Sequence, residues 1–439
     1  MPIAPAPIHV FGLGLPVLEE DAALPRFRRL AHPAIEAAQV LIGGKDQLAT
    51  YADHPCEKLP VGKDMDSLYA AIQANYAVGK RQAILCGGDP LFFGLGSRLA
   101  EILGPESLRI HPGVSCLQAA AALLGLSWEQ VRAVSLHGRH DWFPLAHALL
   151  SAAPVLVLTD ADSSPADIAA WMLERGLWRY KLHVLENMYQ TPDGSVRAAS
   201  HLQLSLEQAE STAWENGNEP IQRVVLIRPL IRPQAQSWPF GLNDADVVKE
   251  NKLLTKAPVR VAALAALGIE PRHTVWDLGA GSGAVGLEAA RLAWQGRVYA
   301  VERNPDRIAL IRKNRRKYGA ANLEIVQGAM PDCLPVPETS DRIFIGGGLS
   351  GDSAKAVEIL TRAWDALVPD GRLAVDCVLL SSLELARATL FKLGAKVNVS
   401  SLQASTSSPL AGDIRLEAHN PVFLILAEKP IRSARYERD

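Results

Sequence analysis

Short apolar runs that end in glycine recur along the first half of the chain, and stretches of helical period separate them. Each run predicts a buried strand, because a glycine at its exit permits a positive φ or a close approach of backbone. The strands predicted in this way are residues 8–11, 40–42, 83–86, 108–110 and 134–136, and further apolar runs without a glycine exit predict strands at residues 154–159, 183–186 and 223–228. Helices are expected between them, for example at residues 66–79, 92–103 and 115–124. Strands that alternate with helices predict a largely parallel sheet.

This rhythm breaks at residues 229–246, which are rich in proline and have little apolar period. Such a segment predicts an interdomain linker, and Trp238 and Phe240 within it suggest that it packs on a surface. We therefore expect a first domain at residues 1–232, a linker at residues 233–248 and a second domain at residues 249–439.

A second α/β pattern follows the linker. Its predicted strands are residues 275–278, 297–302, 323–327, 342–345, 372–377, 397–401 and 422–427. Its predicted helices are residues 255–267, 283–293, 305–318, 353–367 and 381–393. The last two strands lack a full helix between them, so they are expected to pair antiparallel at the edge of the sheet. The second domain is therefore expected to be a Rossmann-like doubly wound sheet with an antiparallel terminal hairpin.

Composition and charge narrow the classes of partner. Hydrophobic residues make up 48% of the 439 residues and charged residues 21%, as in a soluble globular protein. The net charge of −2 gives no global attraction to nucleic acid or anionic lipid, and no apolar run approaches the ~18–20 residues of a membrane span. The cysteines are scattered without a C-x-x-C pair, and the segment His137–Asp141 has no third metal ligand at a spacing typical of a metal site. We expect a cytoplasmic protein with no metal, no nucleic-acid partner and no membrane partner.

The sharpest motif is the loop Asp277–Gly283, with the sequence DLGAGSG, between a predicted strand and a predicted helix. Its glycines let the backbone approach a ligand, and the start of the helix offers free N–H groups. About 20 residues further on, Glu302 ends the next strand, where an acid can accept both hydroxyls of a ribose. Ala329 follows the third strand, where an adenine edge would lie, and Gly346–Gly351 form a lip over the presumed reactive centre.

Two cofactors fit this loop. Gly281, Gly283 and Gly286 also satisfy the dinucleotide fingerprint, so an NAD oxidoreductase is an alternative. Asp277 favours S-adenosyl-L-methionine, because a carboxylate would repel a pyrophosphate and attract a sulfonium ligand that carries an amino group.

The C-terminal motifs together resemble a known family. Residues 249–429 are similar to the decarboxylating precorrin methyltransferase domain of cobalamin biosynthesis. The motifs that carry this resemblance are Thr255-Lys256, Arg260, the DLGAGSG loop, VERNPDR, GAMPDCLP, IGGGLSG and NPVF. The resemblance implies that adenosylmethionine is contacted by Thr255, Gly279, Ala280, Gly281, Ser282, Gly283, Glu302 and Ala329.

The first domain has its own motifs: GLGLP from Gly12, GGDPLFFG from Gly87, PGVSCLQAA from Pro112 and SLHGR from Ser135. They resemble the two-lobed tetrapyrrole methylase fold over residues 8–229, in the branch that methylates C5 of the corrin precursor. In that fold backbone groups hold adenosylmethionine between two α/β lobes. The resemblance implies a second cofactor site at Gly12, Gly14, Gly88, Asp89, Phe92 and Ser115, where Ser115 is also expected to cap a helix.

The first loop departs from the family pattern. The family has Gly-x-Gly-Pro-Gly, whereas Leu15-Pro16 stands here in place of Pro-Gly, and Glu19, Glu20 and Asp21 follow. Either the loop takes a different turn, which we favour, or the N-terminal site is weakened or altered in substrate.

The two resemblances imply one bifunctional enzyme and a homo-oligomer. The second domain would methylate C15 of precorrin-6B and decarboxylate its C12 acetate, and the first would methylate C5, giving precorrin-8. No catalytic residue is assigned, since an electron-rich carbon needs alignment more than activation. Lys256, Arg260 and Arg415 are guesses for holding the carboxylate arms. Three alternatives remain: a cobalt-containing substrate, an RNA methyltransferase that uses the basic run 312–317, and a first domain that serves only as a scaffold. If the protein does not bind RNA, the basic run is expected to be a solvated helix face.

Overall fold

The computed structural model of the chain describes residues 6–17, 27–62, 64–151, 153–160, 162–191, 195–214, 223–230, 240–250, 254–335 and 339–431. Glu19, Glu20, Asp21 and Trp238 lie outside these ranges. The chain divides into two compact units. Unit 1 comprises Met1–His140, Ala153–Ile168 and Lys181–Arg228, and unit 2 comprises Asp141–Ala152, Ala169–Tyr180 and Pro229–Asp439.

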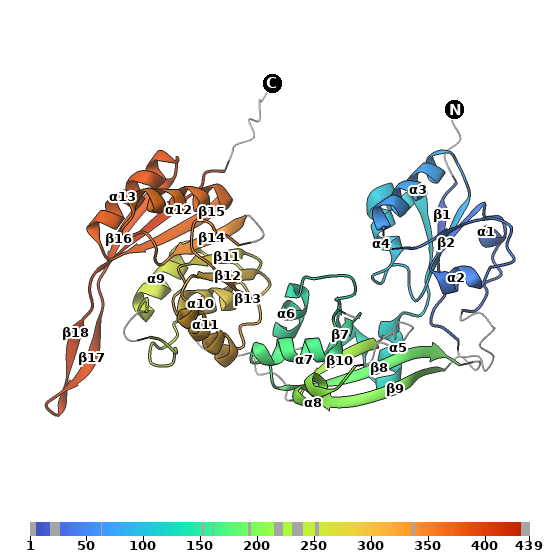
Figure 1. Ribbon diagram of the computed structural model, residues 1–439, viewed down its shortest axis with the longest axis horizontal. Coiled ribbons are helices and arrows are strands. Elements are labelled where there is room, and N and C mark those ends of the chain that lie inside the picture. Colours follow the sequence, from blue (N-terminus) through green and yellow to red (C-terminus); the bar gives the residue numbers. More distant parts are fainter. Residues whose placement is uncertain are drawn as a thin grey trace, which may run out of the picture. The chain divides into compact units, whose positions relative to one another are not determined.

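The first sheet of unit 1 has the strand order β3-β2-β4-β1-β5, and the strands are parallel. Figure 1 draws it in blue, with β1 and β2 labelled. Its strands are β1 (Ile8–Gly12), β2 (Val40–Gly43), β3 (Glu57–Pro60), β4 (Gln82–Cys86) and β5 (Leu108–His111). The helices among them are α1 (Pro33–Glu36), α2 (Lys45–Ala49), α3 (Met65–Ala77) and α4 (Leu95–Leu103). Both faces of this sheet are covered by apolar side chains, so its central strands are continuous apolar runs. Because the strands are parallel, β1, β4 and β5 end at one edge.

The second sheet of unit 1 is mixed, so the expectation of a largely parallel sheet is wrong for it. Its order is β6-β7-β10-β8-β9, in which β7 pairs antiparallel with β10 and β8 pairs antiparallel with β9. Its strands are β6 (Arg132–Ser135), β7 (Val155–Leu158), β8 (Tyr180–Gln190), β9 (Val196–Ser205) and β10 (Arg223–Pro229). The helices α5 (Cys116–Leu124) and α8 (Leu206–Ser211) belong to unit 1. The helix α6 (Phe143–Leu150) belongs to unit 2, and α7 (Pro165–Glu174) begins in a segment of unit 1 and ends in one of unit 2.

Unit 2 contains the expected doubly wound sheet, with the order β13-β12-β11-β14-β15-β19-β16. Its strands are β11 (Thr274–Leu278), β12 (Arg297–Glu302), β13 (Leu323–Gln327), β14 (Ser340–Ile345), β15 (Leu367–Cys377), β16 (Lys396–Leu402) and β19 (Val422–Glu428). The antiparallel pair at the edge is confirmed: β19 runs antiparallel to both β15 and the edge strand β16. The helices are α9 (Ala257–Leu267), α10 (Ala284–Leu292), α11 (Pro305–Tyr318), α12 (Ser353–Ala366) and α13 (Leu380–Lys392).

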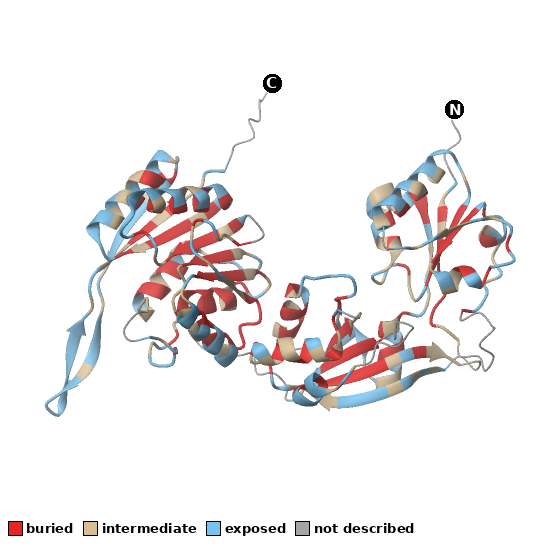
Figure 2. Cartoon of the chain, viewed as in Figure 1, coloured by how far each residue is buried: buried red, intermediate tan, exposed pale blue. Residues whose placement is uncertain are grey.

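Helices cover both faces of this sheet, and Figure 2 shows its strands as the most buried part of unit 2. One apolar core lies between the sheet and α12 and α13, and the other lies between the sheet and α9, α10 and α11. Part of the expected linker belongs to the second core, because Leu242 and Val247 are buried there while Phe240 is 41% exposed.

A two-stranded hairpin that was not predicted lies between β16 and β19. It consists of β17 (Ser405–Leu410) and β18 (Asp413–Ala418), which pair only with each other among the described strands and project from the sheet (Figure 1). Its two turn residues, Ala411 and Gly412, both have positive φ, as a two-residue hairpin turn requires. None of the helices in the described ranges is both long and apolar enough to cross a membrane.

Candidate functional site

The glycine loop of unit 2 lies where the strand order reverses, between β11 and β14. In doubly wound sheets ligands bind in the crevice outside the carboxyl ends of the strands at this point. The backbone N–H groups of Gly279 and Ala280 both donate to the carbonyl of Val301, at 3.0 Å. A Cβ on Gly279 would lie 3.1 Å from the backbone nitrogen of Gly347, and its φ is +77°. The backbones of the loop and of the glycine lip after β14 are therefore in contact.

Glu302 connects this loop to the next two strands. Its Oε2 accepts from the N–H of Gly281, and its Oε1 accepts from the N–H groups of Arg303 and Asn304, all at 2.9 Å. Its carbonyl accepts from Gly328, the residue before Ala329. The structure thus brings Glu302, the loop and the exit of β13 together, with the carboxylate in a fixed orientation.

Asp277 lies beneath the loop rather than on its open face. It is 1% exposed, and its Oδ2 accepts from the N–H of Gly286 at 2.8 Å. Burial raises the pKa of Asp277 to about 7, and the charges of Asp376 and Glu302 act in the same direction. A Cβ on Gly286 would lie 3.0 Å from the Asp277 carboxylate. The third glycine of the dinucleotide-like pattern therefore makes room for this carboxylate.

Thr255 lies just before α9 and faces a carboxyl group that the sequence analysis missed. Its hydroxyl donates to Oδ2 of Asp376, near the end of β15, at 3.3 Å. Burial raises the pKa of Asp376 to about 6, although the bond from Thr255 opposes the shift. A single acid in the apolar run of residues 373–380 was the available sequence signal.

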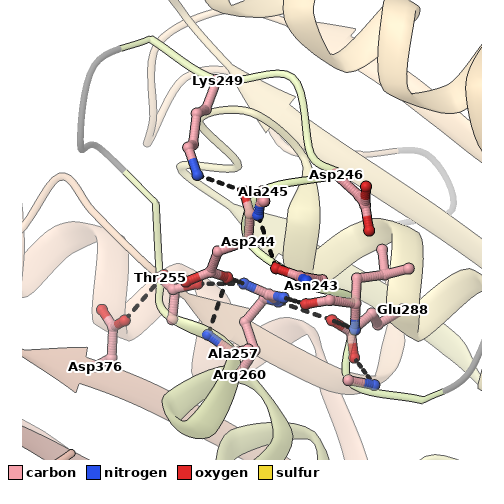
Figure 3. A network of polar contacts seen from close by, with 12 residues as sticks. Asn243, Asp244, Ala245, Asp246, Lys249, Thr255, Ala257, Arg260, Glu288 and Asp376 are labelled. Atoms are coloured by element: carbon pink, nitrogen blue, oxygen red, sulfur yellow. Dashed lines mark hydrogen bonds and ion pairs between the residues drawn. The ribbon is translucent and has the colours of Figure 1, made fainter. Parts of the chain in front are cut away.

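Arg260 is the centre of a buried polar network (Figure 3). Its guanidinium donates to Glu288 Oε1 and Asp244 Oδ1, both at 2.8 Å, and to the carbonyls of Thr255 and Leu242, both at 2.5 Å. Because Arg260 and Glu288 are both 0% exposed, the guess that Arg260 holds a substrate carboxylate is wrong.

The other basic candidates have different surroundings. Lys256 is half-buried at the N-cap of α9, and Arg415 is exposed on the β17–β18 hairpin. The basic run of α11 is a solvated face except for Arg315, which is buried, donates to the carbonyl of Leu323 and pairs with Glu324. The central arginine of this run is therefore buried and does not face solvent, which counts against the RNA methyltransferase alternative.

The glycines of unit 1 meet where β1, β4 and β5 end. A Cβ on Gly12 would lie 2.5 Å from the nitrogen of Gly113 and 2.6 Å from the carbonyl oxygen of Gly88. The N–H of Gly88 donates to the carbonyl of Gly14 at 2.7 Å. The three loops of the expected N-terminal site are therefore in backbone contact, which requires glycine on each side.

The remaining N-terminal candidates lie on the same loops. Asp89 accepts from the N–H of Leu91 at 2.8 Å, and its carbonyl accepts from the N–H of Phe92. Ser115 caps α5 through a capping box with Gln118, which confirms its expected capping role.

The departure at Leu15-Pro16 has a structural reason. Leu15 is 6% exposed and belongs to the core cluster that includes Leu117 and Met188. The carbonyl of Pro16 accepts from the N–H of Gln190 at 2.8 Å. The chain thus passes from the first loop to the second sheet, and a turn different from that of the family stays a prediction.

Sequence reasoning also missed a histidine cluster beside these loops. His9 Nδ1 lies 3.0 Å from His111 Nε2, and the ring of His111 is stacked on Phe11 with His32 edge-on. Burial first, then the neighbouring histidines, lowers the pKa of both His9 and His111. Across the described ranges, no group of His, Cys, Asp or Glu is arranged to hold a metal ion.

Comparison with known proteins agrees with two different methyltransferase domains in one chain. The family of tetrapyrrole (corrin/porphyrin) methylases matches residues 18–188, and the precorrin methyltransferase domain matches residues 246–429. A precorrin-6Y C(5,15)-methyltransferase [decarboxylating] from Sinorhizobium sp is 30% identical over 302 residues, which are 68% of this chain and 69% of the relative. The chain belongs to this precorrin-6Y C(5,15)-methyltransferase (decarboxylating) family.

Two further relatives match about one domain each. A probable cobalt-precorrin-6B C(15)-methyltransferase (decarboxylating) from Saccharolobus solfataricus is 33% identical over 40% of this chain and 89% of its own length. The crystal structure of a precorrin-6Y C5,15-methyltransferase from Geobacter metallireducens is 35% identical, with a TM-score of 0.40, over 44% of this chain and all of that chain.

Proposed function

We propose that this chain transfers methyl groups from S-adenosyl-L-methionine to C5 and C15 of precorrin-6B and removes CO2 from the C12 acetate, giving precorrin-8. The observation that carries the proposal is the family membership shown by the Sinorhizobium relative, which is named for both methylations and for decarboxylation. The cobalt-containing form of the substrate is the second candidate, because the Saccharolobus relative is named for it.

The work divides between the domains. We assign C15 methylation and decarboxylation to residues 249–439, because a relative that matches only 40% of this chain is named for those two steps alone. C5 methylation then falls to residues 1–232, in which the tetrapyrrole methylase match lies. Residues 233–248 connect the two.

In unit 2 the residues present fit adenosylmethionine, which supplies an electrophilic methyl group on a sulfonium. Glu302 would accept the ribose hydroxyls, since its oxygens are already oriented by backbone donors. Gly279, Ala280, Gly281, Ser282 and Gly283 would provide backbone contacts, with Ala329 at the adenine and Thr255 at the methionine end. The enclosed carboxylate of Asp277 favours the cation without touching it.

In unit 1 a second molecule would be held by backbone. Gly12, Gly14 and Gly88 leave no Cβ between the loops, and Phe92 and Ser115 border the same edge. Asp89 offers a carboxylate to the charged end of the ligand. No step of either reaction needs an activated nucleophile from the protein, because the ring carbon that accepts the methyl group is electron-rich.

Mass spectrometry and calorimetry test this function together. Metal-free precorrin-6B and adenosylmethionine should yield a product that has gained two methyl groups and lost CO2. Titration of adenosylmethionine should give two sites per chain, whereas a scaffold role for the first domain gives one. Glu302→Ala should weaken one site about ten- to hundredfold, because it removes charged hydrogen bonds of about 1.5–3 kcal/mol. Glu358→Ala, on the exposed face of α12, is the control, and two unaltered sites in Glu302→Ala would contradict the assignment.

We also propose that the protein is a homo-oligomer that binds no nucleic acid. The β17–β18 hairpin supports self-association, because Leu410, Ile414 and Leu416 are 52–75% exposed on an element that has no partner strand among the described residues. Replacing residues 405–418 with a short turn should reduce the mass measured by light scattering toward that of one chain. An unchanged mass would remove the hairpin from the contact.

A further inference from the structure

Decarboxylation needs a proton as well as an electron sink. When the acetate arm loses CO2, the C–C bond breaks and its electron pair passes into the ring system. A new C–H bond must then form at the same carbon, so that the arm becomes a methyl group. The proton has to come from an acid that is protonated near neutral pH and can reach the substrate.

Among the described residues, three carboxyl groups lie in the last two positions of the parallel strands of the unit 2 sheet, at the ends of β11, β12 and β15, and the oxygens of two of them already accept backbone hydrogen bonds. Glu302 uses both oxygens to accept three backbone N–H groups. Asp277 is 1% exposed and holds the N–H of Gly286 beneath the loop. Asp376 is only half-buried, and the Thr255 hydroxyl binds its Oδ2, which leaves Oδ1 to carry a proton.

The position of Asp376 suits a substrate rather than a cofactor contact alone. β14 and β15 are parallel neighbours with Ile345 opposite Val375, so Asp376, which is still paired with β19, lies level with Gly346, where β14 has ended. The residues that follow, Val378–Leu380, are 54–68% exposed and apolar. An apolar lip beside a carboxyl group fits a flat macrocycle that carries an acetate arm.

The surroundings of Asp376 favour its neutral form. Burial raises its pKa to about 6 against the opposing bond from Thr255, and the charge of Asp376 in turn helps to raise the pKa of Asp277. The thiol of Cys377 stays neutral, because burial and the charge of Asp376 raise its pKa to about 11.

We propose that Asp376 is the acid that protonates the acetate carbon as CO2 leaves, and that Thr255 is the positioning residue that orients its carboxyl group. The inference rests on the proposed function. Asp376 becomes a carboxylate in this step, and solvent returns its proton before the next turnover.

The test is a product analysis of the full-length Asp376→Asn variant with precorrin-6B and adenosylmethionine. We expect methylation to continue and decarboxylation to fall by at least about a hundredfold, so that a product still heavier by CO2 accumulates. Asp376→Glu should recover part of the decarboxylation. Asp370→Asn is the matched control, because Asp370 is exposed toward the other end of the same strand and should leave both rates unchanged.

A pH profile separates the two roles. Decarboxylation by the wild type should fall as the pH rises through about 6, since the acid must be protonated, and the residual rate of Asp376→Asn should lack this step. Thr255→Val should move the step to higher pH, because the lost bond holds the pKa of Asp376 down, and Thr255→Ser should restore it.

Two outcomes overturn the proposal. In one, Asp376→Asn decarboxylates at the wild-type rate. In the other, it loses methylation and decarboxylation in equal proportion to a weaker binding of adenosylmethionine, which would make Asp376 a cofactor contact. A wild-type chain that does not methylate the tetrapyrrole at all overturns the proposed function, and the role of Asp376 with it.

Discussion

Replacing Arg260 by alanine should strongly destabilise unit 2 and loosen its cofactor site. The substitution leaves the fully enclosed Glu288 without its cation, with hydrogen bonds from the N–H groups of Gly241 and Leu242. It also removes the donor to the carbonyl of Thr255, the residue that faces the site. One side chain therefore connects the stability of the unit with the position of a proposed binding residue.

The magnitude follows from the burial of the pair. Breaking a buried ion pair by removing one partner costs about 3–5 kcal/mol, mainly because the other charge stays in the interior. Arg260→Met combined with Glu288→Gln should recover part of this loss, because the glutamine oxygen still accepts from one of the two backbone N–H groups and neither of the two fully buried positions carries a charge.

Hydrogen exchange followed by mass spectrometry can measure this effect for each unit separately. Amides in α10 and β12 should lose about 3–5 kcal/mol of protection in Arg260→Ala, and amides in β4 of unit 1 should keep theirs. Arg362→Ala is the control within unit 2. It breaks an exposed pair with Glu358 that is worth about 0.3–0.5 kcal/mol. A loss below about 1 kcal/mol in Arg260→Ala would refute the reasoning from burial.

Two further predictions concern pH. Because the pKa of Asp277 is raised, its contribution to the stability of unit 2 is present at acid pH and is lost as the pH rises through about 7. Asp277→Asn lacks this loss, so its free energy of unfolding in urea, relative to that of the wild type, should be higher at pH 8 than at pH 5. If this difference is the same at both pH values, Asp277 does not titrate in this range. The pKa values of His9 and His111 are lowered, so unit 1 should lose stability as the pH falls below about 6.5, and His111→Gln should weaken this dependence in thermal unfolding at pH 7.5 and 5. An equally steep dependence in the variant would exclude the histidine pair as its source.

The sequence predicts the buried strands well and the exposed ones poorly. Strands such as β4 and β11 are apolar on both faces, and that composition is visible in any short window. β3, β9, β17 and β18 were missed because their residues are largely polar or exposed, so only pairing with a neighbour identifies them as strands. Pairing is a long-range property that a local pattern does not contain.

The dependence on long-range pairing also explains which residues of the candidate site could be predicted from the sequence. The loop at Asp277–Gly283 and the acid at Glu302 were visible because their spacing along the chain is fixed by one strand-loop-helix-strand unit. The partners of Arg260 were not, because they come from a loop and from a different helix. Asp376 lies about 100 residues after the loop and reaches the site only because β14 and β15 are neighbours in the sheet.

The two glycine-rich edges use glycine for different purposes. In unit 1, Gly12 and Gly113 allow backbones to touch, so the groups left for a ligand are peptide N–H and C=O. In unit 2 the glycine loop lies over the buried carboxyl group of Asp277, Asp376 lies near the end of β15, and burial disfavours the charged forms of both. A cationic ligand relieves that cost, and a ligand that has lost its positive charge does not. For the proposed cofactor, we therefore expect the acidic edge of unit 2 to bind the sulfonium more tightly than the neutral thioether left after methyl transfer, which would help the release of the product.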